Sequence, residues 1–377
     1  MRPRDTGSYR RDMRIQALAV PLCAAALLLT ACTANAARMD TVRGDLDAMI
    51  RSGAVGAVAT LTDNGVTTVM ATGLADLTAK SPMPTDPTEH FRVGSITKSF
   101  TAAIALQLAA EHRLDLDRSI ETYLPGLLTG NGVDGRAITV RQILGHRSGL
   151  SDPTATADTN EYEAARTGRT YTPTQEIALA LRSSTQITPG IRFEYSNTNY
   201  LIAGMLIESV TGRPYADELR DRILIPLNLA DTYLPATGDT GLREPHPTGY
   251  AVVDGVPVDR TRVEPSLPWT SGALVSTGTD LNRFYTALQS GRVVPQAQLR
   301  QMLDGVDMGH GDGMSYGLGV GYTQLPCGTE FIGHVGGLTG FSAIAGATAD
   351  GRAVTISYTG QPAIDDIPGL LAHALCD

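Results

Sequence analysis

Two pairs of β-prone runs, one near each end of the chain, have the pattern of antiparallel hairpins. Near the start, residues 55–62 and 66–73 flank Asp63-Asn64-Gly65, and an Asn-Gly pair favours the positive φ angles of a tight turn. Near the end, residues 341–348 and 353–359 flank a turn that contains an Asp-Gly pair. We therefore expect strands at both ends of the fold.

Helical patterns fill much of the chain between these hairpins. Residues 99–111 are almost continuously apolar, and residues 200–210 have a helical period that ends at Gly212. A shorter helix is expected over 139–144 and a closing helix over 364–375. Residues 153–168 are expected to form a loop that could overhang a site. Strands at both ends with helices between them predict one sheet domain that is interrupted by a helical insertion.

The first residues have the features of an export signal. Several arginines precede an apolar run at residues 15–31, which is too short and wrongly flanked for a membrane-spanning helix. The Leu-Thr-Ala-Cys sequence at 29–32 predicts a lipid anchor on Cys32, and we favour this lipoprotein signal. The alternative is simple secretion after Ala34-Asn35-Ala36, in which Cys32 has no special role. Both alternatives place the protein outside the cytoplasm, and only the first gives it a contact with the membrane, through the lipid on Cys32.

Composition and charge narrow the class of protein. The chain has 377 residues, 42% of them hydrophobic, and a net charge of −9. Loss of residues 1–31, with five Arg and two Asp, would make the charge three units more negative, −12, which argues against nucleic acid as a partner. Cys23 would leave with the signal. In an oxidising compartment Cys327 and Cys376 would then pair as a disulfide, the alternative being two buried free thiols.

The use of lysine points to a catalytic centre. Only Lys80 and Lys98 are lysines among 30 basic residues, and Lys98 follows Ser95 by three positions, so on a helix the two side chains can meet. A desolvated amine can lose its proton and act as a base, whereas a guanidinium cannot. Ser95 also lies at an expected helix start, where backbone N–H groups favour developing negative charge. The plainer alternative is a helix cap at Ser95 and a surface charge at Lys98.

Two later segments carry polar groups suited to the same chemistry. Tyr195 beside a lysine can shuttle a proton, and the amide of Asn197 can orient a substrate carbonyl. Equally, Asn197 could cap a helix and Tyr195 could simply pack. In the third segment, His334-Val335-Gly336-Gly337, the glycines would let a substrate lie close against an edge strand, although His334 alone would more often be structural.

Together these segments resemble the motifs of the serine penicillin-recognising enzymes, for which Ser-x-x-Lys is characteristic. With Tyr-x-Asn at 195–197 and His-x-Gly at 334–336, the pattern is similar to the branch that holds class C β-lactamases and D-Ala-D-Ala carboxypeptidases. Secreted actinobacterial D-Ala-D-Ala carboxypeptidases are the closest match, and the cysteine pair fits that group too. The resemblance covers about residues 40–377.

The resemblance implies an α/β (α+β) fold of the β-lactamase/transpeptidase-like type, an antiparallel sheet flanked by helices. The expected organisation is a signal over 1–36, a sheet domain over 37–100 and 270–377, and an inserted all-helical subdomain over 101–269. No metal or cofactor is implied, and we expect a monomer.

The resemblance also implies catalytic roles. Ser95 would attack the carbonyl, Lys98 and Tyr195 would handle its proton, and Asn197 would hold the substrate amide. The N–H groups of Ser95 and Gly337 would form the oxyanion hole. His334, Gly336 and Trp269 would complete the substrate-binding cleft, although a packing role for Trp269 is an equal alternative.

The leading expectation for function is therefore a D-Ala-D-Ala carboxypeptidase that acts on peptide or ester substrates, such as peptidoglycan stem peptides, and binds β-lactams. Such carboxypeptidases grip the terminal carboxylate with a threonine after the His and an arginine about thirteen residues before it, and here Val335 and Gly321 stand at these positions. Arg147 is one candidate to supply the grip. The alternatives are an esterase or D-amino-acid peptidase, a class C β-lactamase, and a non-catalytic penicillin-binding lipoprotein.

Overall fold

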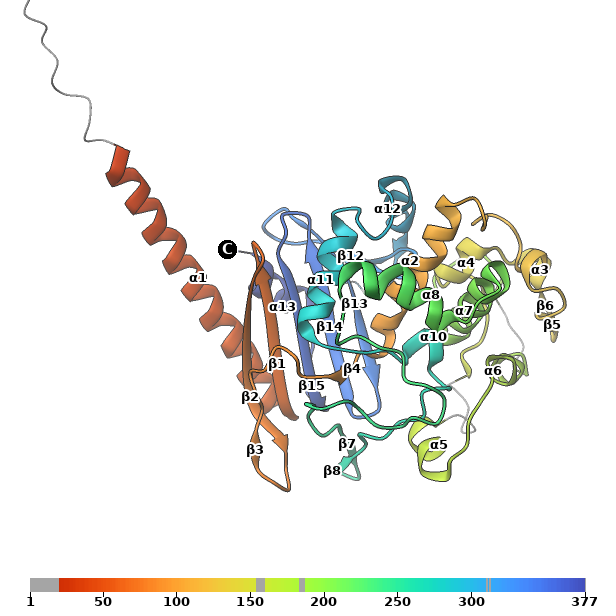
Figure 1. Ribbon diagram of the computed structural model, residues 1–377, viewed down its shortest axis with the longest axis horizontal. Coiled ribbons are helices and arrows are strands. Elements are labelled where there is room, and N and C mark those ends of the chain that lie inside the picture. Colours follow the sequence, from red (N-terminus) through yellow and green to blue (C-terminus); the bar gives the residue numbers. More distant parts are fainter. Residues whose placement is uncertain (1–19, 154–159, 183–186, 310, 312, 377) are drawn as a thin grey trace, which may run out of the picture.

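A nine-stranded antiparallel sheet forms the centre of the protein (Figure 1). The computed structural model describes residues 20–153, 160–182, 187–309, 311 and 313–376, and the side chains from residue 35 onward. The strand order is β10-β11-β12-β13-β14-β15-β1-β2-β3. The strands are β1 (Ala54–Asp63), β2 (Val66–Asp76), β3 (Ser81–Pro82), β10 (Val306–Asp307), β11 (Ser315–Tyr316), β12 (Gly321–Gln324), β13 (Glu330–Leu338), β14 (Phe341–Thr348) and β15 (Ala353–Gly360).

Both predicted hairpins are present, and they lie side by side in the sheet. In the first, Asp63 pairs with Val66 across a two-residue turn in which Asn64 and Gly65 have φ angles of 49° and 80°. The second joins β14 to β15. Strand β1 then pairs with β15, so that the first and last hairpins form a continuous sheet although they are far apart in the sequence.

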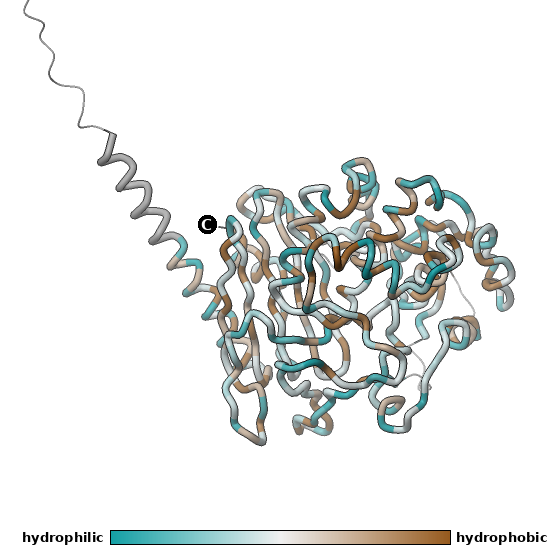
Figure 2. The backbone as a smooth tube through the Cα atoms, viewed as in Figure 1, coloured by the Kyte–Doolittle hydropathy of each residue, from teal (hydrophilic) through white to brown (hydrophobic). Residues whose placement is uncertain are grey.

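Helices cover both faces of this sheet, as the implied fold class requires. On one face α1 (Val20–Arg51) and α13 (Ile367–Leu375) bury Leu46 and Leu371 against the strands. On the other face lie α11 (Gly278–Gln289) and α2 (Thr97–Ala110), whose rings Phe284 and Phe100 stack with their centroids 3.8 Å apart. Figure 2 shows hydrophobic residues recurring along the sheet strands and the helices that pack on them. No described helix is long and apolar enough to cross a membrane.

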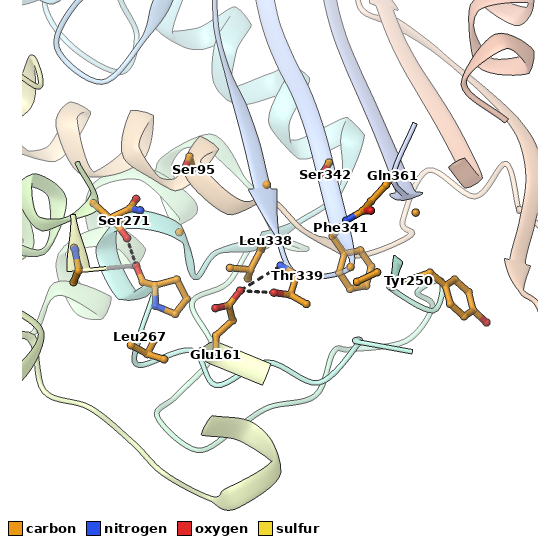
Figure 3. A pocket seen from close by; sticks show the side chains of 18 of the residues that line it. Ser95, Glu161, Tyr250, Leu267, Ser271, Leu338, Thr339, Phe341, Ser342 and Gln361 are labelled. Atoms are coloured by element: carbon orange, nitrogen blue, oxygen red, sulfur yellow. Dashed lines mark hydrogen bonds between the residues drawn. The ribbon is translucent and has the colours of Figure 1, made fainter. Parts of the chain in front are cut away.

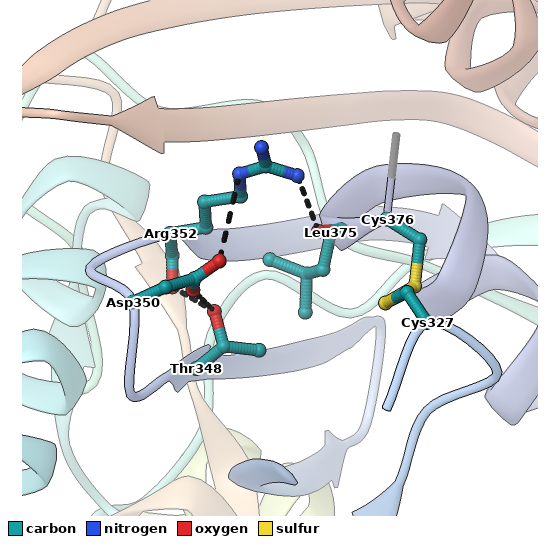
Figure 4. Close-up of a disulfide and its surroundings, with 6 residues drawn as sticks. All are labelled: Cys327, Thr348, Asp350, Arg352, Leu375 and Cys376. Carbon is teal, nitrogen blue, oxygen red and sulfur yellow. Dashed lines mark hydrogen bonds and ion pairs between the residues drawn. A yellow bond between two sulfur atoms is a disulfide. The ribbon is translucent and has the colours of Figure 1, made fainter. Parts of the chain in front are cut away.

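The predicted disulfide joins Cys327, in the turn before β13, to Cys376 at the end of α13 (Figure 4). It therefore fixes the last helix to the sheet. Beside it the guanidinium of Arg352, in the turn before β15, donates to the carbonyl of Leu375, which is a second link between the sheet and the end of α13.

The part of the chain between the two hairpins is mostly helical, and the predicted helices at 99–111, 139–144 and 200–210 are α2, α4 and α7. Two differences from the expectation are local: α5 lies in a stretch that we expected to be a loop, and two short hairpins, β5–β6 and β7–β8, interrupt the segment expected to be all-helical. The remaining elements are β4 (Phe91–Arg92), η1 (Gly94–Ile96), α3 (Ile120–Tyr123), β5 (Thr129–Gly130), β6 (Val133–Asp134), η2 (Gly135–Ala137), α4 (Val140–Leu144), α5 (Glu161–Thr167), α6 (Pro173–Ala180), α7 (Asn197–Thr211), α8 (Tyr215–Leu219), η4 (Arg220–Leu224), α9 (Ile225–Leu227), β7 (Tyr250–Val253), β8 (Val256–Asp259), α10 (Trp269–Gly272), β9 (Val275–Ser276) and α12 (Gln296–Met302).

Candidate active site

Ser95 lies in the short helix η1, directly against strand β13. Gly94 has a φ angle of 53°, and a Cβ atom there would lie 2.6 Å from the backbone nitrogen of Gly337. A Cβ atom on Gly336 would lie 1.9 Å from the carbonyl oxygen of Val93. Only glycine fits these two positions. The glycines therefore allow the strand to approach the serine, and they bring the predicted residues Gly336 and Gly337 to Ser95.

Lys98 is fully buried one turn further along, and its amine makes three hydrogen bonds. Nζ donates to Ser95 Oγ at 3.0 Å, to Asn197 Oδ1 at 2.7 Å and to the carbonyl oxygen of Ser271 at 2.8 Å. Burial lowers the pKa of Lys98 to about 7, although the negative charge of Asp152 opposes this shift. A sizeable fraction of Lys98 is therefore neutral near pH 7 and able to accept the proton of Ser95.

Tyr195 faces the same two groups. The Lys98 nitrogen lies 4.9 Å from the centre of its ring. Burial raises the pKa of Tyr195 well above its usual value, and a hydrogen bond with Ser95 only partly offsets this. The phenol therefore keeps its proton near neutral pH, which makes Lys98 the better base and Tyr195 a carrier of protons between groups.

Asn197 is the first residue of α7, and its amide is oriented from both ends. Its Oδ1 accepts from Lys98, while Nδ2 and the backbone nitrogen donate to the carboxylate of Asp152 at 3.1 and 2.9 Å. Its side chain does not cap the helix, since the N-cap residue is Ser196. Asp152 thus positions Asn197 and adds a negative charge near Lys98.

His334 is a buried, neutral side chain. Its Nδ1–H donates to the carbonyl oxygen of Val335 at 2.6 Å, and the Tyr316 hydroxyl donates to Nε2 at 3.0 Å. Burial, and then the positive charge of Lys98, lower the pKa of His334 to about 3. His146 is likewise buried, and its ring packs on Tyr195 with centroids 4.1 Å apart. These uncharged imidazoles hold the tyrosines in place without adding positive charge.

A cavity of about 450 Å³ opens at Ser95 (Figure 3). Asn197 and Gly337 line it beside the serine, and Leu267, Leu338 and other apolar residues form its walls. Two carboxyl groups, from Glu161 and Glu176, also line it, whereas none of the described lining residues is a lysine, arginine or histidine. The cavity is therefore suited to a ligand with an apolar part and a positive charge.

The two carboxyl groups differ in their surroundings. Glu161 comes from α5, and its Oε1 accepts from the Thr339 hydroxyl at 2.5 Å, just beyond the end of β13 (Figure 3). Glu176 in α6 is 1% exposed, and its Oε1 has no hydrogen-bond partner. Burial and the nearby Asp152 raise the pKa of Glu176 to about 9, so this group is protonated near neutral pH in the empty site.

Two predicted contributors lie elsewhere. Trp269 is not among the described residues that line the cavity. Its ring packs against Tyr215, with ring centroids 5.9 Å apart, which agrees with the alternative packing role, and Leu267 and Pro268 form that wall. Arg147 donates to the carbonyl of Gly190 and borders a different cavity. It therefore does not supply the missing carboxylate grip.

Sequence reasoning missed several residues of the site, namely Asp152, Glu161, Glu176, Ser271, Tyr316 and Thr339. The acidic ones are three of 39 Asp and Glu residues, and no local motif separates them from the others. The one available clue was the expectation that residues 153–168 could overhang a site. Glu161 lies within this range.

Several known proteins share this fold. A D-stereospecific amidohydrolase from Streptomyces sp. superposes with a TM-score of 0.80 at 36% sequence identity, over 89% of this chain and 98% of that one. The D-amino acid amidase of Ochrobactrum anthropi SV3, in complex with L-phenylalanine amide, gives a TM-score of 0.75 at 29% identity, over 89% and 96% of the two chains.

Sequence comparison leads to the same group of proteins. The D-aminopeptidase of Cereibacter sphaeroides is 29% identical over 324 residues, which are 82% of this chain and 58% of that protein. The chain spans between 37% and 60% of the length of the curated relatives that it matches. Residues 37–368 match the family described as Beta-lactamase. Because this match covers most of the chain and includes the predicted catalytic residues, the protein belongs to the β-lactamase family of serine hydrolases.

Proposed function

We propose that this protein hydrolyses amides and peptides whose acyl residue is a D-amino acid with a free α-amino group. The observation that carries the proposal is the pair of carboxyl groups in the cavity at Ser95, Glu161 and Glu176, without a described basic residue beside them. The carboxylate of Glu161 would attract a substrate ammonium and repel a substrate carboxylate. The protonated carboxyl group of Glu176 can accept a hydrogen bond from the same ammonium through its carbonyl oxygen.

The D configuration is carried over from the relatives. The amidohydrolase is named as D-stereospecific, the amidase is named for D-amino acids, and the third relative is named a D-aminopeptidase. This proposal replaces the D-Ala-D-Ala carboxypeptidase expected from the sequence. A carboxypeptidase needs donors for a terminal carboxylate, and Val335 and Gly321 supply none.

The proposed reaction follows from the arrangement of Ser95, Lys98 and Tyr195. Ser95 Oγ attacks the substrate carbonyl while neutral Lys98 takes its proton. The backbone N–H groups of Ser95 and Gly337 stabilise the resulting oxyanion. Tyr195 donates its proton to the departing amine as the C–N bond breaks and regains one from protonated Lys98, which leaves an acyl-enzyme and a neutral Lys98. A water molecule, deprotonated by the same groups, then releases the free amino acid.

The test compares D-phenylalanine amide with its N-acetyl derivative and its L enantiomer. We expect the free-amine D substrate to be preferred by at least tenfold in kcat/KM, which corresponds to about 1.4 kcal/mol. Glu161→Gln should raise KM for the free amine and leave the slower hydrolysis of the acetylated amide unchanged.

Glu163→Gln is the matched control, because Glu163 lies on the same helix, is exposed, and pairs with Arg166 instead of lining the cavity. Equal rates for the free and acetylated amides would contradict the proposal. Fast turnover of a D-Ala-D-Ala peptide with a blocked amino terminus would favour a carboxypeptidase instead.

A further inference from the structure

A second cavity, of about 270 Å³, lies next to the catalytic groups and is almost entirely apolar. Tyr195 and His334 border it on the side of the active site. Its remaining described lining residues are Met308, Met314, Tyr316, Gly321, Phe331, Gly333, Val335, Ile344, Ile367 and Leu371. None of them is a lysine, arginine, aspartate or glutamate, and burial holds the pKa of His334 near 3, so this cavity carries no positive charge at neutral pH.

Different parts of strand β13 line the two cavities. The first contains Gly337 and Leu338, whereas the second contains His334 and Val335, which come earlier on the same strand. Ser95 lines the first cavity, and Tyr195, which shares a hydrogen bond with Ser95, lines the second. A substrate with its acyl residue in the first cavity and its carbonyl at Ser95 would therefore direct its leaving group toward the second.

Tyr195 supports this direction of the leaving group. It is the group proposed to give a proton to the departing amine, and its side chain lines the second cavity and not the first. Proton donation requires the amine to lie within hydrogen-bond reach of the phenol. The departing group must then begin at the mouth of the second cavity.

The walls of this cavity determine which leaving group it suits. Val335 is 41% exposed and contributes an apolar side chain to the wall of this cavity. Met308 and Met314 stand at the ends of the loop between β10 and β11, where the Met308 nitrogen donates to the Met314 carbonyl oxygen at 3.1 Å. Methionine side chains adapt to apolar groups of different shape.

We infer that the second cavity is a subsite for an apolar leaving group, such as a branched alkyl or aromatic amine, or an apolar second residue whose carboxylate is not gripped. This inference rests on the proposed function and deepens it. The preferred substrates would then be D-aminoacyl amides and peptides that carry a bulky apolar group after the scissile bond.

The experiment uses D-phenylalanine amides of three primary amines: methylamine, 3-methylbutylamine and 4-aminobutyrate. The departing group is a primary alkyl amine in each, so the three amide bonds have similar reactivity. Differences in kcat/KM therefore report mainly how well the enzyme binds the leaving group before and during acylation. We expect the 3-methylbutyl amide to exceed the methyl amide by about tenfold or more, as for several methylene groups that enter an apolar pocket. The 4-aminobutyrate amide should show no such gain.

Met308→Gln should reduce the preference for the 3-methylbutyl amide severalfold, and Met308→Leu is the matched control that keeps the wall apolar and should retain it. Val335→Thr should also lower the preference. Equal rates on all three amides, or a best rate with 4-aminobutyrate, would overturn the inference and leave the proposed function standing. Hydrolysis of none of them by folded enzyme would overturn both.

Discussion

The amine nitrogen of Lys98 lies 3.0 Å from the hydroxyl oxygen of Ser95, and the same nitrogen donates to Asn197 and to the carbonyl of Ser271. When Lys98 is neutral it has two protons and one lone pair. The two other acceptors can take the protons, which leaves the lone pair for the serine. This arrangement aims the base at the nucleophile before substrate binds.

Removal of either partner should stop acylation. We expect Ser95→Ala to abolish covalent labelling by a fluorophosphonate probe, because no nucleophile remains. Lys98→Arg should lose nearly as much activity as Lys98→Ala, because a guanidinium cannot cycle a proton. Ser290→Ala, at an exposed serine outside the site, is the control. Labelling of Ser95→Ala at the parental rate would show that another residue is the nucleophile.

The pH dependence of kcat/KM should reveal the shifted pKa of Lys98. Below about pH 7 the amine is protonated and cannot accept a proton, so the rate should fall as the pH falls through this value. The charge of Asp152 raises the pKa of Lys98, so Asp152→Asn should move the acidic limb of the profile to lower pH. A limb that stays in place, or moves to higher pH, would exclude Lys98 as the titrating base.

Stability should depend on the buried carboxyl group of Glu176. Its pKa rises from an ordinary 4.5 to about 9 on folding, so its protonated form supports the fold fully below pH 4.5 and this support is lost as the pH rises toward 9. Glutamine cannot ionise. Glu176→Gln should therefore match the parent in urea unfolding at pH 4 and exceed it by at least about 1 kcal/mol at pH 8. Glu163→Gln, at an exposed site, should show no such pH-dependent difference.

The disulfide should contribute strongly to stability. Cys327 and Cys376 are 49 residues apart, and closing a loop of this length restricts the unfolded chain by about 4 kcal/mol in the chain-entropy model. We expect the double variant Cys327→Ser and Cys376→Ser to unfold at a clearly lower temperature. Reduction of the parent with dithiothreitol should give the same shift, and an unchanged unfolding temperature in both cases would contradict this role.

Cellular location is a separate proposal that depends on residues 29–32. We expect the mature protein to remain with the membrane through a lipid on Cys32, and Cys32→Ala to be released in soluble form. Cell fractionation with mass spectrometry of the first mature residue tests this. Parent protein found entirely in the culture fluid, beginning at Ala37, would support the simple secretory site instead.

The sequence by itself determined the features that depend on neighbouring residues. Asn64-Gly65 can adopt positive φ angles at low cost, so it defined the first hairpin without help from the rest of the chain. The spacing of Ser95 and Lys98 brings their side chains together within one helical turn. The resemblance added Tyr195, Asn197 and the glycines of β13, which the fold does bring to Ser95.

Only the tertiary structure decided the features that depend on distant contacts and on burial. Asp152 hydrogen-bonds to Asn197, 45 residues away in the sequence. Ser271 hydrogen-bonds to Lys98 over 173 residues, and Glu161 to Thr339 over 178 residues. No local sequence pattern encodes such pairs. The amine of Lys98 becomes a base because the surrounding chain removes water from it, and desolvation is a property of packing. The same packing placed Trp269 against Tyr215 and left carboxyl groups in the cavity. For this reason the substrate that we propose has a free amine in place of the free carboxylate expected from the sequence.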